Sequence, residues 1–273
     1  KYYLIPRQIE ECGLSASNVE FQEDGLQEII RGYTQEAGLR ELERQVAKIC
    51  RKLARKKLNE RRENFSISKE EVSRLLGPGK IHRLSLPLLK RKNYAGVATG
   101  LVWSEFGGEV IFVETCRMQG NQNLLLTGSL GRVLQESAQI ALSFIRSNGS
   151  YLKLDPDFFA KSDIHIHIPS GSVPKDGPSA GLTIAMALIS LLANIPVYRD
   201  IAISGEITLS GEVLPVSGIR DKLLAASRLG IKKVVLPSGN KDDVLHLGDV
   251  VSGMDVVFVE EILDAVPHVL SKT

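Results

Sequence analysis

The sequence has few cysteines, little net charge and no long apolar run, and each shortage excludes a class of protein. Its three cysteines, Cys12, Cys50 and Cys116, lie far apart and lack metal-ligand spacing. They argue against a disulfide framework and for a reducing compartment. A formal net charge of +2 is too small to indicate a nucleic-acid or membrane partner by itself. The longest apolar candidate, residues 182–193, is shorter than the ~20 residues of a bilayer span, so we expect a buried helix there.

The start of the chain lacks both a signal peptide and an initiator methionine. Lys1-Tyr2-Tyr3 leads into a helix-like pattern without an apolar h-region or a cleavage site. We therefore expect a piece of a longer protein, located in a bacterial cytoplasm or, as the alternative, in a mitochondrial matrix. The C-terminal Ser271-Lys272-Thr273 does not match the peroxisomal address S-K-L. The length of 273 residues suits two domains of unequal size.

Residues 1–79 have the pattern of a small all-α domain. Apolar residues recur there at spacings of three and four, which predicts the buried face of a long helix. They are Leu39, Leu42, Val46, Ile49 and Leu53. The opposite face is basic, and its interspersed glutamates without interleaved aromatic residues favour a solvated face over a nucleic-acid site. A short helix follows, with a capping box from Ser68 to Glu71 and an end at Gly77-Pro78-Gly79.

After a basic connector over residues 80–93, residues 94–273 change to alternating strands and helices. Two strands, 97–103 and 109–117, flank Gly107-Gly108 and predict a β-hairpin. Further strands are expected at 163–168, 201–204, 233–236 and 256–259. Helices are expected at 132–146, 179–192, 220–228 and 262–270. A hairpin followed by this alternation predicts an α/β (α+β) domain with a mixed sheet and flanking helices.

The stretch from Pro174 to Gly181 could carry a nucleophile. Its two glycines and two prolines indicate a tight turn that leads directly into an apolar helix. Ser179 lies at this junction, where the N–H groups of a helix start could hold an oxyanion. Ala180 and Gly181 are small enough to let another chain approach closely. Ser179 could equally be only an N-cap, a common role for serine.

A serine hydroxyl needs a base to act as a nucleophile, and Lys222 is a candidate besides the five histidines. It follows a turn at Gly218 and precedes the apolar run 223–226. The positive end of a helix and apolar neighbours both disfavour the charged form of a lysine. Such a lysine can act as a base near neutral pH. Taken alone, Lys222 could also be an ordinary surface lysine.

Asp163, His165 and His167 alternate along the chain, so we expect them on one face of a strand. A zinc hydrolase could use such a set. Neither a fourth ligand nor an H-E-x-x-H pattern accompanies them. We therefore favour a structural role beside a substrate cleft and expect no metal site.

The two candidate catalytic stretches resemble the motifs of the Lon proteases, a family that uses a Ser–Lys dyad. Residues 174–181 are similar to its nucleophile motif and residues 205–222 to its lysine motif, with Ser179 and Lys222 separated by 43 positions, as in that family. Residues 96–103, 126–131 and 164–169 agree as well, so the resemblance covers residues 94 to about 259. It implies an ATP-dependent serine endopeptidase of protein quality control, which degrades unfolded, damaged or short-lived regulatory proteins as a homo-oligomer, a hexamer. It implies no membrane partner, and nucleic acid is not expected for this chain.

The resemblance also implies supporting residues. Ser204 stands where the family usually has threonine, and its hydroxyl would hydrogen-bond Lys222 and hold the neutral amine toward Ser179. Asp176 and Glu114 match acidic positions near the active site of the family, and they could modulate the charge of the lysine or order the loop before Ser179. The loop residues that would shape the oxyanion site are Gly177, Pro178 and Ala180.

Residues 33–44 resemble the small helical subdomain of the Lon AAA+ ATPase. Arg40 matches the arginine that senses bound nucleotide, and a guanidinium at a helix start is a reasonable γ-phosphate contact. The phosphate-binding pattern G-x-x-x-x-G-K-[ST] is missing from the sequence. We expect no cofactor in this chain, with ATP and Mg²⁺ acting at a site elsewhere in the full-length protein. Two alternatives stay open: a catalytically inactive, ring-forming Lon-like module of a recombination ATPase, and a metal hydrolase built on Asp163, His165 and His167.

Overall fold

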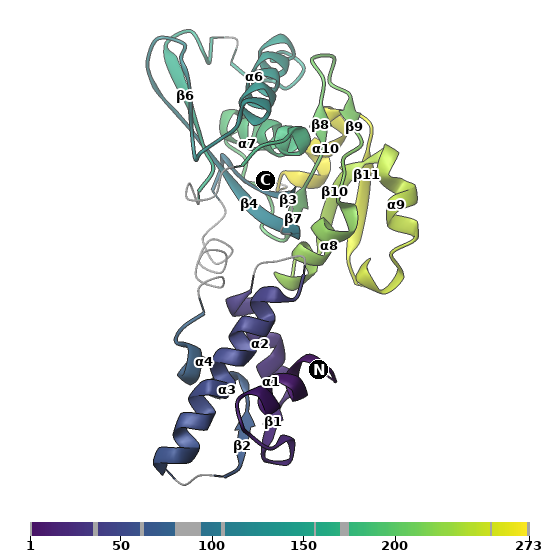
Figure 1. Ribbon diagram of the computed structural model, residues 1–273. Helices are drawn as coiled ribbons and strands as arrows, with labels where there is room; N and C mark the ends of the chain where they lie inside the picture. The colour runs from purple at the N-terminus through teal and green to yellow at the C-terminus, as the bar shows by residue number, and fades with distance from the viewer. Residues whose placement is uncertain are drawn as a thin grey trace. The chain divides into compact units, whose positions relative to one another are not determined.

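The protein is described from a computed structural model (Figure 1). The structure describes residues 2–34, 38–60, 63–79, 94–104, 107–155, 157–169, 175–251 and 253–271. The chain divides into two compact units, Lys1–Pro87 and Leu88–Thr273, each with its own hydrophobic core. The predicted connector, residues 80–93, lies outside the described residues.

The first unit consists of helices around a short pair of parallel strands. The helices are α1 (Leu4–Glu11), α2 (Glu23–Tyr33), α3 (Arg40–Glu60) and α4 (Lys69–Leu76), and the strands are β1 (Val19–Phe21) and β2 (Phe65–Ile67). The predicted long helix is confirmed as α3, whose residues Val46, Ile49 and Leu53 are fully buried. Leu39 lies before the helix and is 63% exposed, so it does not belong to the buried face. The β1–β2 pair adds strands to a subdomain that we expected to be helical.

Helix α4 begins and ends where the sequence predicts. Ser68 is its N-cap and accepts a hydrogen bond from the N–H of Glu71 at 3.5 Å. Gly77 ends the helix with a φ of 85°, a conformation that glycine adopts without strain. The carboxylate of Glu71 contacts Lys56 at 3.2 Å and Arg74 at 2.7 Å. These ion pairs replace the second half of the predicted capping box, and the contact to Lys56 ties α4 to α3.

In its described part, the second unit is built on a seven-stranded mixed sheet with the order β11-β10-β7-β3-β4-β6-β5. The strands are β3 (Val97–Ser104), β4 (Gly107–Gln119), β5 (Leu124–Thr127), β6 (Ser162–His167), β7 (Ile201–Ile203), β10 (Lys233–Pro237) and β11 (Asp255–Val259). Strand β4 is antiparallel to β3 and β6, and the other pairs are parallel. The mixed sheet and the hairpin are thus confirmed. Gly107 and Gly108 do not form the turn, however, because they pair with Ser104 and Trp103 inside the strands.

Helices cover both faces of this sheet (Figure 1). The first face packs against α6 (Arg132–Ser147), α7 (Gly181–Ala193) and α10 (Ile262–Val269). The second face packs against α8 (Ile219–Arg228) and α9 (Lys241–Leu245). Neighbouring residues of a strand point to opposite faces, so Ile111 belongs to the first core and its neighbour Val110 to the second. A short hairpin of β8 (Glu206–Ile207) and β9 (Val213–Leu214) follows β7.

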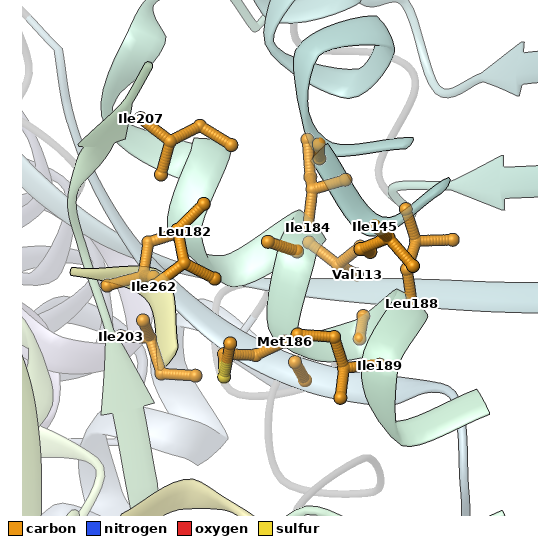
Figure 2. Close-up of a cluster of buried hydrophobic side chains, with 14 of the residues drawn as sticks. Val113, Ile145, Leu182, Ile184, Met186, Leu188, Ile189, Ile203, Ile207 and Ile262 are labelled. Atoms are coloured by element: carbon orange, nitrogen blue, oxygen red, sulfur yellow. The ribbon is translucent and has the colours of Figure 1, made fainter. Parts of the chain in front are cut away.

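Helix α7 is the centre of the larger core. Every residue from Gly181 to Ser190 is buried, because sheet, α6, α10 and β8 surround the helix. Figure 2 shows its side chains between Val113 of β4, Ile145 of α6 and Ile262 of α10. The predicted buried helix is therefore confirmed. Among the described residues, none of the helices has the length and hydropathy of a membrane span.

Candidate active site

Ser179 lies in a short 3-10 turn, η2 (Pro178–Ala180), immediately before α7. Gly177 enters this turn with a φ of 121°, which favours glycine, and Pro178 then supplies the fixed φ of a helix start. The N-cap of α7 is Ala180, and no side chain caps the helix. The interpretation of Ser179 as an N-cap is therefore wrong, and the helix begins two residues later than predicted. The serine hydroxyl is not used to start α7.

The segment that follows β7 holds the backbone of Ser179. The carbonyl oxygen of Ser179 accepts hydrogen bonds from the N–H of Gly205 at 2.9 Å and from the Ser204 hydroxyl at 3.2 Å. The N–H of Leu182 in turn donates to the carbonyl of Gly205 at 3.0 Å. These reciprocal bonds fix the turn before α7 against the carboxyl end of β7.

Ser204 is fully buried and joins three segments of the chain. Besides the contact to Ser179, its Oγ lies 3.0 Å from the carbonyl oxygen of Leu101 in β3. The hydrogen bond to Lys222 that we expected is not among these contacts. A hydroxyl oxygen keeps lone pairs that could accept from an amine, so the supporting role of Ser204 stays a prediction.

Lys222 lies at the end of the first turn of α8 and is only 1% exposed. Burial lowers its pKa to about 8, because the ammonium group loses hydration in the protein interior. A lysine of this kind is partly neutral at mildly alkaline pH and can accept a proton. The alternative of an ordinary surface lysine is therefore wrong.

Ser179 and Lys222 come from helices on opposite faces of the sheet, and their segments converge at one end of it. Strands β3 and β7 are parallel, with Gly100 opposite Ile203, so their carboxyl ends lie at the same edge. Ser204, just after β7, connects Ser179 to β3. Further along β3, the indole N–H of Trp103 donates to Oδ2 of Asp221 at 2.9 Å, directly before Lys222. The carboxyl edge of parallel strands is where α/β proteins commonly form their sites.

Asp176 orders the loop before Ser179. Its Oδ1 accepts from the N–H of Leu134 at 3.1 Å, in the first turn of α6, and from the N–H of Gly177 at 2.9 Å. A carboxylate at a helix N-terminus satisfies free N–H groups and interacts favourably with the helix dipole. Of the two roles considered for Asp176, these contacts favour ordering of the loop. Residues 170–174, including Pro174 of the nucleophile motif, lie outside the described residues.

Glu114 lies in the middle of β4, where it is paired with Val97 of β3 and His167 of β6. Its side chain is half-buried. Its place in the sheet is thereby set by two neighbouring strands, while its role at the active site stays a prediction.

The predicted metal set does share one face of β6, but its members are engaged elsewhere. Oδ1 of Asp163 accepts from the N–H groups of Asn121 and Asn123 at 2.7 and 2.8 Å. His165 and His167 both contact the Thr127 hydroxyl, at 2.9 and 2.7 Å. Over the part of the chain that the structure describes, no three His, Cys, Asp or Glu side chains are arranged to hold a metal ion. The metal-hydrolase alternative therefore loses its structural support.

Comparisons with known proteins match both units of the chain. Residues 66–272 match the Lon protease (S16) C-terminal proteolytic domain, and residues 10–67 match the Lon protease AAA+ ATPase lid domain. The chain belongs to the Lon protease family. This confirms the resemblance of the catalytic motifs to that family and the assignment of the N-terminal helices to its ATPase.

The relatives are Lon proteases of bacteria. The protein of Aquifex aeolicus is 50% identical over 246 residues, which cover 90% of this chain and 30% of the relative. The protein of Syntrophomonas wolfei is 46% identical over 270 residues, which cover 96% of this chain and 33% of the relative. The protein of Dictyoglomus thermophilum is 49% identical over 246 residues, which cover 89% of this chain and 31% of the relative. The chain therefore spans about a third of the length of the Lon proteases that it matches.

In the lid part of this Lon chain, Arg40 is the first residue of α3 and is exposed. An exposed guanidinium at a helix start can reach a ligand that approaches from outside the unit. This position agrees with the nucleotide-sensing role implied by the resemblance, which stays a prediction.

Sequence reasoning missed three residues around Ser179 and Lys222: Trp103, Asp221 and Lys175. Lys175 is a second buried lysine, 9% exposed, whose Nζ lies 3.5 Å from the carbonyl oxygen of Gly128. Burial lowers its pKa and raises that of Glu109 in β4, and the attraction between the two opposite charges offsets part of each shift. The one available signal was that Trp103 is the only tryptophan of the sequence, but its partner Asp221 lies 118 positions away.

Proposed function

We propose that the second unit is a serine endopeptidase in which Ser179 is the nucleophile and Lys222 the general base. The observation that carries this proposal is the environment of Lys222: a buried lysine with a pKa lowered to about 8, on a helix whose N-terminus meets the strand edge that also holds Ser179. A neutral amine at this place has the basicity that proton abstraction from a serine requires.

The proposed reaction is acyl transfer through an acyl-enzyme. Neutral Nζ of Lys222 takes the proton of Ser179 Oγ while Oγ attacks the carbonyl carbon of the peptide bond. Backbone N–H groups around Ser179 hold the oxyanion, and the ammonium then returns the proton to the leaving amine. Lys222 then takes a proton from water, the hydroxide attacks the ester and releases the second product, and the ammonium returns the proton to Oγ of Ser179. Pro178 has no N–H, so it shapes the turn without donating, and the N–H of Gly177 donates to Oδ1 of Asp176, whereas Ala180 keeps an N–H that could donate.

Three residues would support this chemistry. Ser204 would hold the turn of Ser179 through its bond to the carbonyl of that residue, and its lone pairs could accept from neutral Lys222. Asp176 would keep the loop before Ser179 attached to α6. Glu114 would contribute negative charge near the site, as the resemblance to the family implies.

Several features concern the longer protein, because this chain spans about a third of its relatives. We propose that unfolded, damaged or short-lived regulatory proteins are the substrates, delivered by an ATPase whose phosphate-binding loop is not in this sequence. Arg40 would report the nucleotide state of that ATPase to the lid. We propose that the longer protein is a hexamer in the cytoplasm.

The test is the cleavage of casein by the protein and by two variants, Ser179→Ala and Lys222→Ala. Each should abolish cleavage, while Lys232→Ala, an exposed lysine after α8, should leave it unchanged. Near-wild-type cleavage by Lys222→Ala would show that the lysine is not the base. A chelator should have no effect on the cleavage of casein. Failure of a fluorophosphonate to label Ser179 would instead favour an inactive Lon-like module.

A further inference from the structure

The turn end of the β3–β4 hairpin, residues 102–104 and 107–109, lies against the start of the helix that carries Lys222. Trp103 in this part of β3 is 49% exposed, and its indole N–H donates to Oδ2 of Asp221 at 2.9 Å. A hydrogen bond to an ionised acceptor is stronger than one between neutral groups. Asp221 is the residue before Lys222, so this bond fixes the backbone from which the lysine side chain extends.

Two glycines allow the hairpin and the helix to approach closely. Gly108 is paired with Trp103 in the sheet, and a Cβ there would lie 2.1 Å from the carbonyl oxygen of Asp221 and 2.7 Å from the N of Lys222. Gly218, the N-cap of α8, has a φ of 74°, and a Cβ there would lie 2.4 Å from Cγ of Trp103. Backbone therefore touches backbone at Gly108, and the indole ring covers the N-cap at Gly218. The first turn of α8 has no room to shift toward the hairpin.

The other face of the same hairpin end is directed toward the segment of Ser179. Val102 and Glu109 are paired on the face opposite Trp103. Val102 packs against the core around α7, and Glu109 attracts Lys175, four residues before Ser179. In addition, Ser204 links Leu101 of β3 to the carbonyl of Ser179. One short piece of β3 and β4 thus contacts the segments of both dyad members.

We propose that this hairpin end positions Lys222 relative to Ser179, and that Trp103 and Asp221 are positioning residues for the lysine. The inference rests on the proposed function, because it assigns a partner to each member of the same dyad. A base must lie within ~2.6–3.2 Å of the proton that it removes. A displacement of ~1 Å at an active site can cost a hundredfold in rate. The long lysine side chain needs an anchored backbone to meet this requirement, and the Trp103–Asp221 bond supplies the anchor.

The experiment measures kcat and KM for a fluorogenic peptide, together with the pH dependence of kcat, in the protein and its variants. Trp103→Phe keeps a ring over Gly218 but removes the N–H, and we expect kcat to fall about tenfold with KM within twofold, the effect of one hydrogen bond to a charged group. In the unsubstituted protein, kcat should rise with pH as Lys222 loses its proton. In Trp103→Phe this rise should move to higher pH, because a looser helix start admits water to Lys222 and stabilises its charged form. Asp221→Ala should behave in the same way.

Conservative and control variants separate positioning from a general structural effect. Asp221→Asn keeps an acceptor oxygen and should restore most of kcat relative to Asp221→Ala. Arg228→Ala changes an exposed residue at the far end of the same helix, and Tyr151→Phe removes a polar atom from an exposed aromatic residue. Both variants should retain kcat and the pH profile. Trp103→Phe with unchanged kcat and pH profile, or Asp221→Asn as slow as Asp221→Ala, would overturn the inference.

The proposed function can fail separately from this inference. If the unsubstituted protein is not labelled at Ser179 by a fluorophosphonate and does not cleave the peptide, the dyad itself is refuted. If it is labelled and cleaves, while the Trp103 and Asp221 variants match it, only the positioning by the hairpin is refuted.

Discussion

Burial of Lys222 should make the stability of this protein depend on pH in a defined way. The pKa of Lys222 is lowered from 10.5 to about 8 in the folded state. Below about pH 8 the folded protein must hold a buried ammonium, which the unfolded chain exposes to water. A shift of this size corresponds to about 3 kcal/mol of lost stability, since each pKa unit is worth ~1.4 kcal/mol. Between about pH 8 and 10.5, Lys222 is neutral in the folded state but still protonated in the unfolded state. Because the unfolded state holds one more proton in this range, rising pH removes the penalty and the free energy of unfolding increases.

Lys222→Met removes the charge and keeps a long unbranched side chain. We expect the variant to be more stable than the unsubstituted protein by up to about 3 kcal/mol at about pH 7, and the difference to fall to nearly zero at about pH 10.5. Urea unfolding followed by the fluorescence of Trp103, the only tryptophan, reports on the unit that contains Lys222. Lys232→Met is the matched control, since this lysine is exposed. A stability difference that does not change between the two pH values would refute the lowered pKa.

Three substitutions around the site give further tests. Ser204→Ala should lower the free energy of unfolding by ~1–3 kcal/mol, because it removes the one hydroxyl donor that the carbonyl groups of Leu101 and Ser179 share, whereas Ser204→Thr should not. Asp176→Ala should cost ~1 kcal/mol in urea unfolding, because α6 loses its cap, and an unchanged midpoint would contradict that role. Gly108→Ala should lower peptidase activity at least about tenfold, because a Cβ would meet the backbone of Asp221. Gly149→Ala is its control, since the nearest atom to a Cβ there is 3.6 Å away.

Local patterns predicted most of the elements in the second unit, because long helices and buried strands carry a clear periodicity. The helices α6, α8 and α10 begin and end within two residues of their predicted bounds. Strands β5, β8 and β9 were missed, and β8 and β9 have only two residues each, too few to show a period. The start of α7 was misplaced by two residues, because proline and glycine indicate a turn but do not say that a 3-10 turn precedes the helix.

The active site could be predicted only in part. The flanking turn and apolar run suggested the burial of Lys222, and the structure agrees. The pairing of Lys222 with Ser179 came from the resemblance to the family, since nothing in the linear order shows that α7 and α8 meet the same strand edge from opposite faces. The Trp103–Asp221 bond and the partners of Ser204 depend on the same long-range packing, which strand register determines and local composition does not.

The most direct test of the dyad is the rate at which a fluorophosphonate labels Ser179 as a function of pH. The reagent reacts with a serine only when a base removes its proton, so the rate reports the ionisation of that base. We predict a rate that rises with pH around a midpoint of about 8, the pKa of Lys222, and that is lost in Lys222→Met. Labelling of Ser179 that proceeds equally well in Lys222→Met, or a midpoint that stays the same in that variant, would contradict the account.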